Sequence, residues 1–177
     1  MRLIPFEDLC VPLTEIHEGI TTFEFRTVHP ELSVGEGRCF PAEIMVNVQV
    51  TTVGSDFLLD VSAQSEGQFL CDRCGEAFRR MAKGRFKVLF TPDAEKAGNA
   101  DEEEVRLLSP RNHAIDIRQD VTDALILALP GRLICQENCK GLCPRCGINR
   151  NLNDCQCEDE MTDSRWEALR NLSFDDE

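Results

Sequence analysis

The chain has 177 residues, of which 42% are hydrophobic, and its formal net charge is −13. This length suits one domain, or one domain with a small appendage, and the hydrophobic content is enough for an ordinary packed core. So acidic a surface repels nucleic acid at long range, which excludes tight binding of an open phosphate backbone by the whole surface. Any contact with RNA must therefore come from a local basic patch.

The ten cysteines of the chain set its chemical context. The first residues, MRLIPFEDLC, hold no apolar run long enough for a signal peptide, and no run of about eighteen apolar residues occurs that could span a membrane. We therefore expect a cytoplasmic protein with no membrane partner. In a reducing compartment, so many cysteines indicate metal or redox chemistry rather than a disulfide framework.

Alternating apolar residues in the first half of the chain predict an antiparallel meander with one packed face and one wet face. Turns are predicted at VGSD (residues 53–56) and at EGQ (residues 66–68), and FLC then leads into the first CxxC motif. The residues that share the packed face are, strand by strand, Ile44, Val46, Val48 and Val50; Phe57, Leu59, Val61 and Ala63; and Phe86, Val88 and Phe90.

Two helices are predicted after the meander, beyond a solvated loop, DAEKAGNADEEEV (residues 93–105), which carries an acidic run at residues 101–104. IDIRQDVTDALILALPG has Asp116 as a cap, Gln119 three residues later and Pro130 at its end. Its apolar stripe is expected to cover the packed face of the sheet. The stripe consists of Val121, Ala124, Leu125, Ala128 and Leu129. DSRWEALRNL, which contains Trp166, predicts a short C-terminal helix.

Eight of the cysteines are spaced as metal ligands. Zinc takes four thiolate or imidazole ligands in a tetrahedron, and a CxxC turn supplies two of them on one side of a loop. Eight cysteines therefore make two complete sets. We predict a long-range set that pins the end of the first helix to the sheet, formed by Cys71, Cys74, Cys135 and Cys139. The other set is local, with CxxC–x8–CxC spacing, and is formed by Cys143, Cys146, Cys155 and Cys157.

Alternatives stay open for these cysteines. In a second partition one centre holds Cys139, Cys143 and Cys146, while Cys135 and Cys155 change places. An iron–sulfur cluster uses four cysteines in the same way, and zinc is favoured because the sequence has no electron-transfer motif. CDRC alone also suits a redox dithiol of Cys71 and Cys74, although its flanks predict antiparallel strands and not the usual βαβ unit. Cys10 and Cys39 are expected to be ordinary buried residues.

Nothing in the sequence indicates catalysis. His17, His29 and His113 are isolated from one another and from every CxxC motif. No Ser-His-Asp order, HExxH, P-loop or GxGxxG is present. A catalytic zinc keeps an open position for water or substrate, and two full thiolate sets leave none. We therefore predict a protein that is not an enzyme and has no small-molecule substrate.

Basic residues gather beside the cysteine motifs. The first set begins within CDRC and consists of Arg73, Arg79, Arg80, Lys83, Arg85 and Lys87. The second surrounds the later cysteines and consists of Arg132, Lys140, Arg145 and Arg150. Part of this charge offsets anionic thiolate centres. If the long-range centre forms, the two sets meet and give an acidic body one basic pole, able to contact the phosphates of RNA or of a ribonucleoprotein.

Four stretches in this order resemble the bacterial and chloroplast YceD family of large ribosomal RNA subunit accumulation proteins. They are CDRCGEAF, IDIRQDVTDALILALP, CQENCKGLCPRCGINRNLNDCQC and DSRWEALRNL, and they cover roughly residues 40–172. The chain departs from the family pattern at Arg150, where a leucine is expected. The resemblance implies a role in accumulation of large-subunit ribosomal RNA and no enzymatic activity. Family members without the last CxxC–CxC set imply that the two centres are independent.

The sequence thus predicts an α+β fold in which a helix covers an antiparallel meander, with two cysteine-rich zinc centres and about two Zn²⁺ per chain. Residues 1–140 form the main domain with the first centre, and residues 141–177 a C-terminal zinc knuckle and short helix. We expect a non-enzymatic factor that supports biogenesis of large-subunit (23S) ribosomal RNA by binding rRNA or a pre-ribosomal particle. The alternatives are an adaptor for a ribosomal protein or RNA-processing enzyme, and a dithiol redox protein using Cys71 and Cys74.

Overall fold

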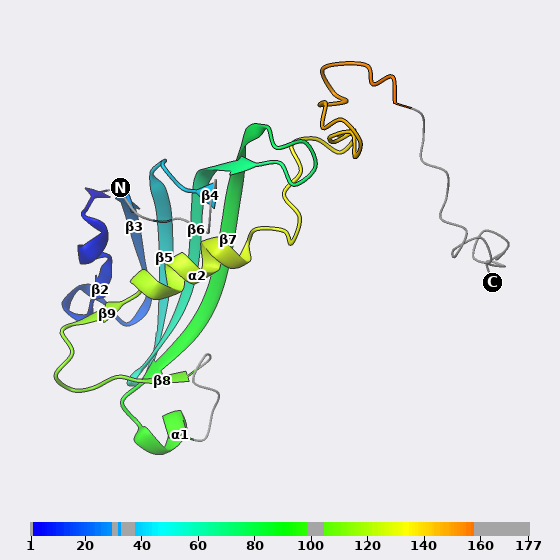
Figure 1. The fold of residues 1–177 in the computed structure, drawn as a ribbon. Helices are drawn as coiled ribbons and strands as arrows, with labels where there is room; N and C mark the ends of the chain where they lie inside the picture. Colours follow the sequence, from blue (N-terminus) through cyan, green and yellow to red (C-terminus); the bar gives the residue numbers. More distant parts are fainter. Residues whose placement is uncertain (1, 30–31, 33–37, 99–104, 158–177) are drawn as a thin grey trace, which may run out of the picture.

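The computed structural model describes residues 2–29, 32, 38–98 and 105–157. In this part of the chain the strands form a main sheet of seven and a small sheet of two (Figure 1). The main sheet contains β1 (Arg2–Leu3), β3 (Gly19–Thr27), β4 (Arg38–Cys39), β5 (Ile44–Val53), β6 (Asp56–Leu70), β7 (Ala77–Thr91) and β8 (Val105–Leu107). The small sheet pairs β2 (Cys10–Pro12) with β9 (Ala114–Asp116). The helices are α1 (Ala94–Gly98) and α2 (Arg118–Leu127), and short 3-10 turns lie at Phe6–Asp8 and Leu13–Glu15.

The predicted meander is confirmed and forms the centre of the main sheet. β3, β5, β6 and β7 are antiparallel neighbours in that order, with short parallel pairs to β1 and β8 at the two edges. Apolar side chains at every second position of a strand point to one face. The predicted face is buried at Ile44, Val46, Val48, Val50, Leu59, Val61, Ala63 and Val88. The protein is therefore α+β, with a mixed and largely antiparallel sheet.

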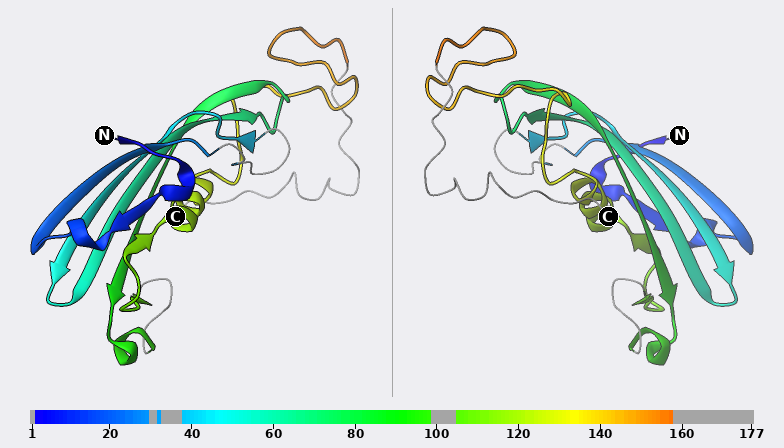
Figure 2. Two further views of the ribbon diagram at one scale, coloured as in Figure 1. Left: turned by 90° about the vertical axis from the view of Figure 1, so that its left-hand side faces the viewer. Right: turned by 90° about the vertical axis from the view of Figure 1, so that its right-hand side faces the viewer.

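α2 covers the packed face of this sheet, as its apolar stripe predicts. Figure 2 shows the strands curving around the helix. Val121 and Leu125 of the stripe are 0% exposed. Close contact with β7 depends on Gly84, where an added methyl carbon would lie 2.3 Å from the carbonyl oxygen of Ala124. The helix therefore rests directly on the backbone of β7.

The predicted turn at EGQ is wrong. Residues 66–68 continue β6 and pair with residues 79–81 of β7. The glycine is there for packing, because a methyl carbon on Gly67 would lie 2.2 Å from the ring of Phe69, which is fully buried. β6 and β7 consequently run on until the chain turns at the first CxxC motif. This extension carries the cysteines to the far end of a long hairpin.

The predicted cap of the helix is displaced by one residue, and Asp116 still accepts a hydrogen bond from the first N–H of the helix. α2 begins after Ile117, whose side chain makes no capping hydrogen bond. Asp116 is the last residue of β9 and pairs with Cys10, so it is held in the small sheet. Its carboxylate accepts a hydrogen bond from the backbone N–H of Arg118 at 3.0 Å and forms an ion pair with the same residue.

The predicted loop at residues 93–105 is wrong at its start, where α1 forms over Ala94–Gly98. Its acidic run at residues 101–104 and the helix predicted in DSRWEALRNL lie outside the described residues. The division of the chain into two domains stays a prediction. Among the described residues, none of the helices combines the length and the apolar character needed to cross a membrane.

Candidate metal centres and the adjoining basic surface

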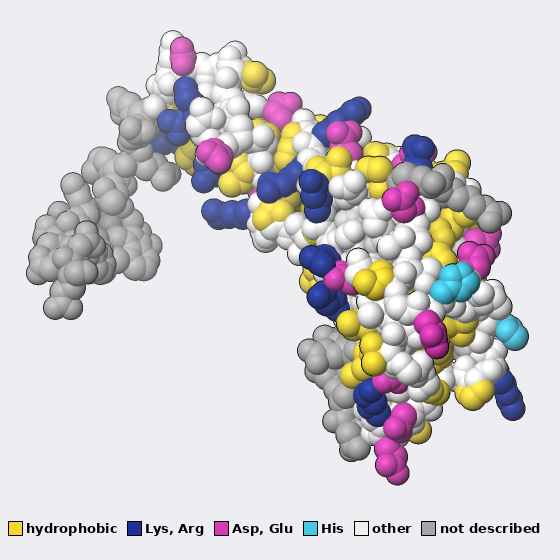
Figure 3. Space-filling model, turned by 180° about the vertical axis from the view of Figure 1, so that it is seen from behind, with side chains coloured by type: hydrophobic (Ala, Val, Ile, Leu, Met, Phe, Trp, Pro, Cys, Tyr) yellow, Lys and Arg dark blue, Asp and Glu magenta, His cyan; other side chains and the backbone are white. Residues whose placement is uncertain are grey.

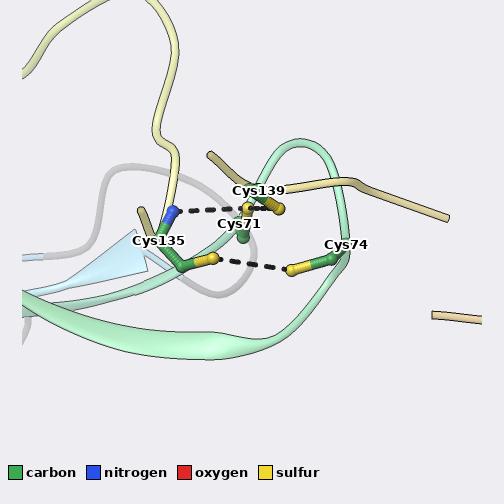
Figure 4. Close-up of side chains that lie close together, drawn as sticks. All are labelled: Cys71, Cys74, Cys135 and Cys139. Carbon is green, nitrogen blue, oxygen red and sulfur yellow. Dashed lines mark hydrogen bonds between the residues drawn. The ribbon is translucent and has the colours of Figure 1, made fainter. Parts of the chain in front are cut away.

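The first cysteine group joins the end of the β6–β7 hairpin to the segment after α2. Cys71 and Cys74 lie in the turn between the two strands, and Cys135 and Cys139 follow the helix (Figure 4). The sulfurs of Cys71 and Cys139 are 3.9 Å apart, and those of Cys74 and Cys135 are 3.7 Å apart. All four sulfurs lie within 4.8 Å of one another. The structure thus brings together the four residues that the long-range partition names.

These distances test whether a metal would fit. With a metal–sulfur bond of about 2.3 Å, a tetrahedral site has sulfur–sulfur edges of about 3.8 Å. The two measured pairs, at 3.9 and 3.7 Å, match that edge. All ten cysteines are free thiols. The group therefore fits a tetrahedral four-thiolate site, of the kind that zinc and iron share.

The backbone around the first group already favours thiolate at one position. Burial raises the pKa of Cys71, but the backbone N–H groups of Cys135, Arg73 and Cys74 outweigh it and lower that pKa to about 6. Burial and the neighbouring sulfurs, that of Cys71 first, raise the pKa of Cys135 to about 12. Crowded thiols thus oppose complete ionisation of the group. A bound cation would remove this opposition, because coordinated thiols are deprotonated.

Asp72 links the hairpin turn, which carries Cys71 and Cys74, to the segment after α2, which carries Cys135 and Cys139. Its backbone N–H donates to the carbonyl of Leu133 at 2.7 Å, and its carboxylate accepts from the backbone N–H of Leu133 at 2.7 Å. The guanidinium of Arg73 donates to the carbonyl oxygen of Cys139 at 3.0 Å. These contacts set the segment after α2 against the hairpin turn through groups other than the sulfurs.

The second cysteine group repeats the turn of the first. Gly75 donates to the carbonyl of Cys71 and Gly147 to that of Cys143, each at 2.9 Å, and the two glycines have φ of 73° and 72°. Such a left-handed conformation favours glycine. The sulfur of Cys155 lies 3.6 Å from that of Cys146 and 3.3 Å from that of Cys143. With Cys157 these sulfurs also lie within 4.8 Å of one another.

Exposure distinguishes the second group from the first. Cys146 and Cys157 are exposed, whereas Cys71, Cys74 and Cys139 are buried. Backbone N–H groups, those of Cys146 and Arg145, lower the pKa of Cys143 to about 6. The sulfurs of Cys155 and Cys146, in that order, raise the pKa of Cys157 to about 12. The second group therefore has the same donor set in a more solvated place.

The two groups are in contact, although the sequence suggests independent centres. The backbone N–H of Leu142 donates to the carbonyl of Arg73 at 3.0 Å. The amide of Asn149 donates to the carboxylate of Glu76 at 3.2 Å, and the amide of Asn151 lies 3.4 Å from the sulfur of Cys139. Sequence reasoning missed both asparagines, and its available signal was the polar loop between the CxxC and CxC motifs.

The basic residues of the first set divide between two faces of β7. Arg80 has the strand parity of the buried Ala82 and Gly84, so it lies on the packed side beyond the helix. The residues on the opposite face are Arg79, Lys83, Arg85 and Lys87. Figure 3 looks onto this outer side of the molecule, where basic side chains extend from the cysteine-rich end onto the sheet among acidic ones.

Carboxylates of the neighbouring strand neutralise part of this charge. Asp60 pairs with Arg85 at 2.6 Å and with Lys87 at 3.4 Å, while Glu66 pairs with Arg79 at 3.3 Å. The carbonyl of Arg73 accepts from the backbone N–H of Leu142 in the second cysteine loop, and the meeting of the two basic sets stays a prediction. Within the described residues, the basic side chains without a carboxylate partner include Arg80, Lys83, Arg145 and Arg150.

Comparisons with known proteins point to one family. A family model described as "Large ribosomal RNA subunit accumulation protein YceD" matches residues 59–173. Uncharacterised proteins of Mycobacterium tuberculosis and Mycobacterium bovis are 30% identical over 127 residues, which cover 70% of this chain and 59% of theirs. The chloroplastic "Large ribosomal RNA subunit accumulation protein YCED homolog 1" of Arabidopsis thaliana is 27% identical over 154 residues, covering 73% of this chain and 48% of that protein. The chain thus spans about half the length of these relatives. No solved structure matches.

Proposed function

The chain belongs to the YceD family of large ribosomal RNA subunit accumulation proteins, and we propose that it is a zinc-binding factor that supports biogenesis of large-subunit ribosomal RNA. In this proposal it binds rRNA or an assembling particle and catalyses no reaction. One observation carries it: two four-thiol groups, in contact with each other, build one end of the molecule. Cations without acidic partners among the described residues surround that end.

The metals have a structural role in this proposal. Four thiolates fill a tetrahedral coordination sphere, so no position is left for a reacting water or substrate. Zinc bound to Cys71, Cys74, Cys135 and Cys139 would tie the segment after α2 to the hairpin. Zinc bound to Cys143, Cys146, Cys155 and Cys157 would close a loop too short to have a core. The grouping of Cys71 and Cys74 with two further thiols favours a metal centre over a redox dithiol.

Metal analysis of the purified chain tests this part of the proposal. We expect about two zinc ions per chain and eight thiols protected from alkylation until a chelator is added. A metal-free protein that forms a reversible disulfide between Cys71 and Cys74 would overturn it in favour of the redox alternative. Iron in place of zinc would keep the ligand set and change the metal.

The basic residues around the centres are proposed to contact phosphate. Lys83 and Arg145 represent the β7 face and the second loop, respectively. The test is Lys83→Ala combined with Arg145→Ala, against a control of Lys96→Ala combined with Arg111→Ala, which removes the same charge far from the cysteines. Each lost phosphate contact lowers the slope of log affinity against log salt by about 1.

We expect the test pair to weaken co-sedimentation with pre-ribosomal particles and to lower the salt slope by about 2. The control pair should change neither. Unchanged co-sedimentation of a folded Lys83→Ala, Arg145→Ala protein would contradict the phosphate-contact proposal.

A protein partner is the second candidate. Leu142 and Leu152 are 46% and 70% exposed on the second cysteine loop, and exposed apolar side chains suit a protein surface better than a phosphate backbone. Apolar docking responds weakly to salt, whereas phosphate binding weakens steeply. Salt-insensitive binding that is lost in Leu152→Ser would therefore identify the adaptor role, for a ribosomal protein or an RNA-processing enzyme.

A further inference from the structure

The second cysteine loop supplies a polar group to the first cysteine group. The side-chain nitrogen of Asn151 lies 3.4 Å from the sulfur of Cys139. A sulfur atom of a thiolate accepts hydrogen bonds, and an N–H donor stabilises its negative charge. Cys139 is buried, so few water molecules can provide that donor in place of the protein. Asn151 therefore stands in the position of an outer-shell partner to the first group.

Other hydrogen bonds hold the side chain of Asn151 in this orientation. Its oxygen accepts from the backbone N–H of Lys140 at 2.8 Å, and its nitrogen also donates to the side-chain oxygen of Asn149 at 2.9 Å. Asn149 in turn donates to Glu76 at 3.2 Å, at the start of β7. Because the oxygen of Asn151 already accepts from a backbone donor, its nitrogen must face the sulfur.

This arrangement requires the second loop to be folded. Asn149 and Asn151 lie between the CxxC and CxC motifs, in the stretch that the second group closes. Gly141, at the entrance to this loop, has φ of 73°, and an added methyl carbon would lie 3.1 Å from the carbonyl oxygen of Arg73. The backbone therefore approaches the first group closely at the entrance, while Asn151 approaches it from within the loop.

We propose that Asn151 is a positioning residue of the first metal centre and that the two centres bind metal cooperatively through it. The inference rests on the proposed metal binding. When its own four cysteines hold a metal, the second loop places the Asn151 amide on the Cys139 sulfur, so the first centre binds its metal more tightly. By linkage, a filled first centre strengthens metal binding at the second centre by the same factor.

The size of the effect follows from the behaviour of outer-shell partners. Loss of such a hydrogen bond weakens metal affinity by roughly 10- to 100-fold. We therefore expect Asn151→Asp to weaken zinc binding at the first centre by about this factor. Aspartate keeps the oxygen that accepts from Lys140 and replaces the donor to Cys139 with an acceptor. Asn153→Asp is the matched control, because Asn153 is an exposed residue of the same loop whose side chain makes no hydrogen bond with the described residues.

The experiment measures zinc affinity of the full chain by competition with a chromophoric chelator, and Co²⁺ absorption reports the number of thiolates bound. Each asparagine variant is made both in the natural chain and in a chain whose second group is removed by Cys143→Ser, Cys146→Ser, Cys155→Ser and Cys157→Ser. Circular dichroism and thermal unfolding verify that each variant keeps the sheet.

Removal of the second group should weaken the first centre by roughly 10- to 100-fold, and Asn151→Asp should add little in that background. Asn153→Asp should match the unaltered chain. Equal first-centre affinity in the unaltered chain, in Asn151→Asp and in the chain without the second group would overturn the coupling while leaving metal binding intact. If the unaltered chain binds neither Zn²⁺ nor Co²⁺, the proposed metal role fails as well.

Discussion

Substitution of Gly84 by alanine tests the close packing of α2 on the sheet. An added methyl carbon would lie 2.3 Å from the carbonyl oxygen of Ala124, 2.5 Å from its carbonyl carbon and 2.8 Å from its β carbon. Two of these three atoms belong to the helix backbone, which cannot move aside as a flexible side chain can. The helix must therefore shift by about 1 Å to restore an ordinary contact.

The cost follows from what the helix buries. A shift of α2 loosens the packing of Val121 and Leu125, which are both 0% exposed. Overpacking in a core costs about 1–3 kcal/mol, and a clash with backbone places this substitution at the upper end. At about 3 kcal/mol, the melting temperature of a chain of this size should fall by about 6–12 °C.

Thermal or urea unfolding measures this loss, with Gly131→Ala as the control. A methyl carbon on Gly131 would have no atom within 4 Å, so that substitution should leave the melting temperature nearly unchanged. Because α2 leads to Cys135, we expect Gly84→Ala also to weaken metal binding at the first group. A melting temperature equal to that of the unaltered chain would refute the close contact between α2 and β7.

Three further predictions concern Asp72, Asp60 and Cys74. Asp72→Ala leaves the backbone N–H of buried Leu133 without its carboxylate acceptor, so urea unfolding should show a loss of about 1–3 kcal/mol. Hydrogen bonds from Arg85 lower the pKa of Asp60, so its stabilisation is complete above the unfolded pKa near 3.9 and disappears as the pH falls through the folded pKa. Asp60→Asn should therefore be less stable than the unaltered chain at pH 7, with the difference vanishing in acid unfolding curves; a constant difference would contradict this. Cys74→Ser should lower the metal content from about two ions per chain to about one, whereas Cys39→Ser should leave it unchanged.

The fold was predictable where a strand has one strictly apolar face. Ile44 and Val61 lie in runs whose period of two is unbroken, so their burial could be read directly. The same reasoning failed at Gly67, because glycine in a polar stretch is typical of a turn. The Phe69 ring occupies the space that a side chain at position 67 would need, and this contact cannot be read from the sequence. β3 was not predicted, because its sequence lacks a regular alternation of apolar and polar residues. Its inward residues, such as Thr21 and Phe23, are only half-buried.

The cysteine groups were predictable for a different reason. Each metal takes four ligands, and one set of four has local spacing, namely Cys143, Cys146, Cys155 and Cys157. Few ways remain to divide the eight sulfurs, so the two groups could be predicted from the number of ligands without knowledge of the geometry. The contact of Asn151 with Cys139 had no such constraint. Asparagine is common in loops for its turn-forming ability, and only the packing of one loop on the other gives its amide a sulfur to contact.

The fold supports the two groups unequally. Cys74 and Cys135 are 61 positions apart in the chain, and closing a loop of that length costs about 4 kcal/mol of chain entropy. Pairing of β6 with β7, burial of α2 and the two hydrogen bonds between Asp72 and Leu133 already accomplish this closure. A metal at the first group therefore strengthens an arrangement that the rest of the fold holds. The second group closes only a short loop, with exposed cysteines at Cys146 and Cys157, and the buried apolar clusters of the described residues lie elsewhere. Its loop is held by its own sulfurs and by its contacts with the first group, so order at the second group depends on order at the first.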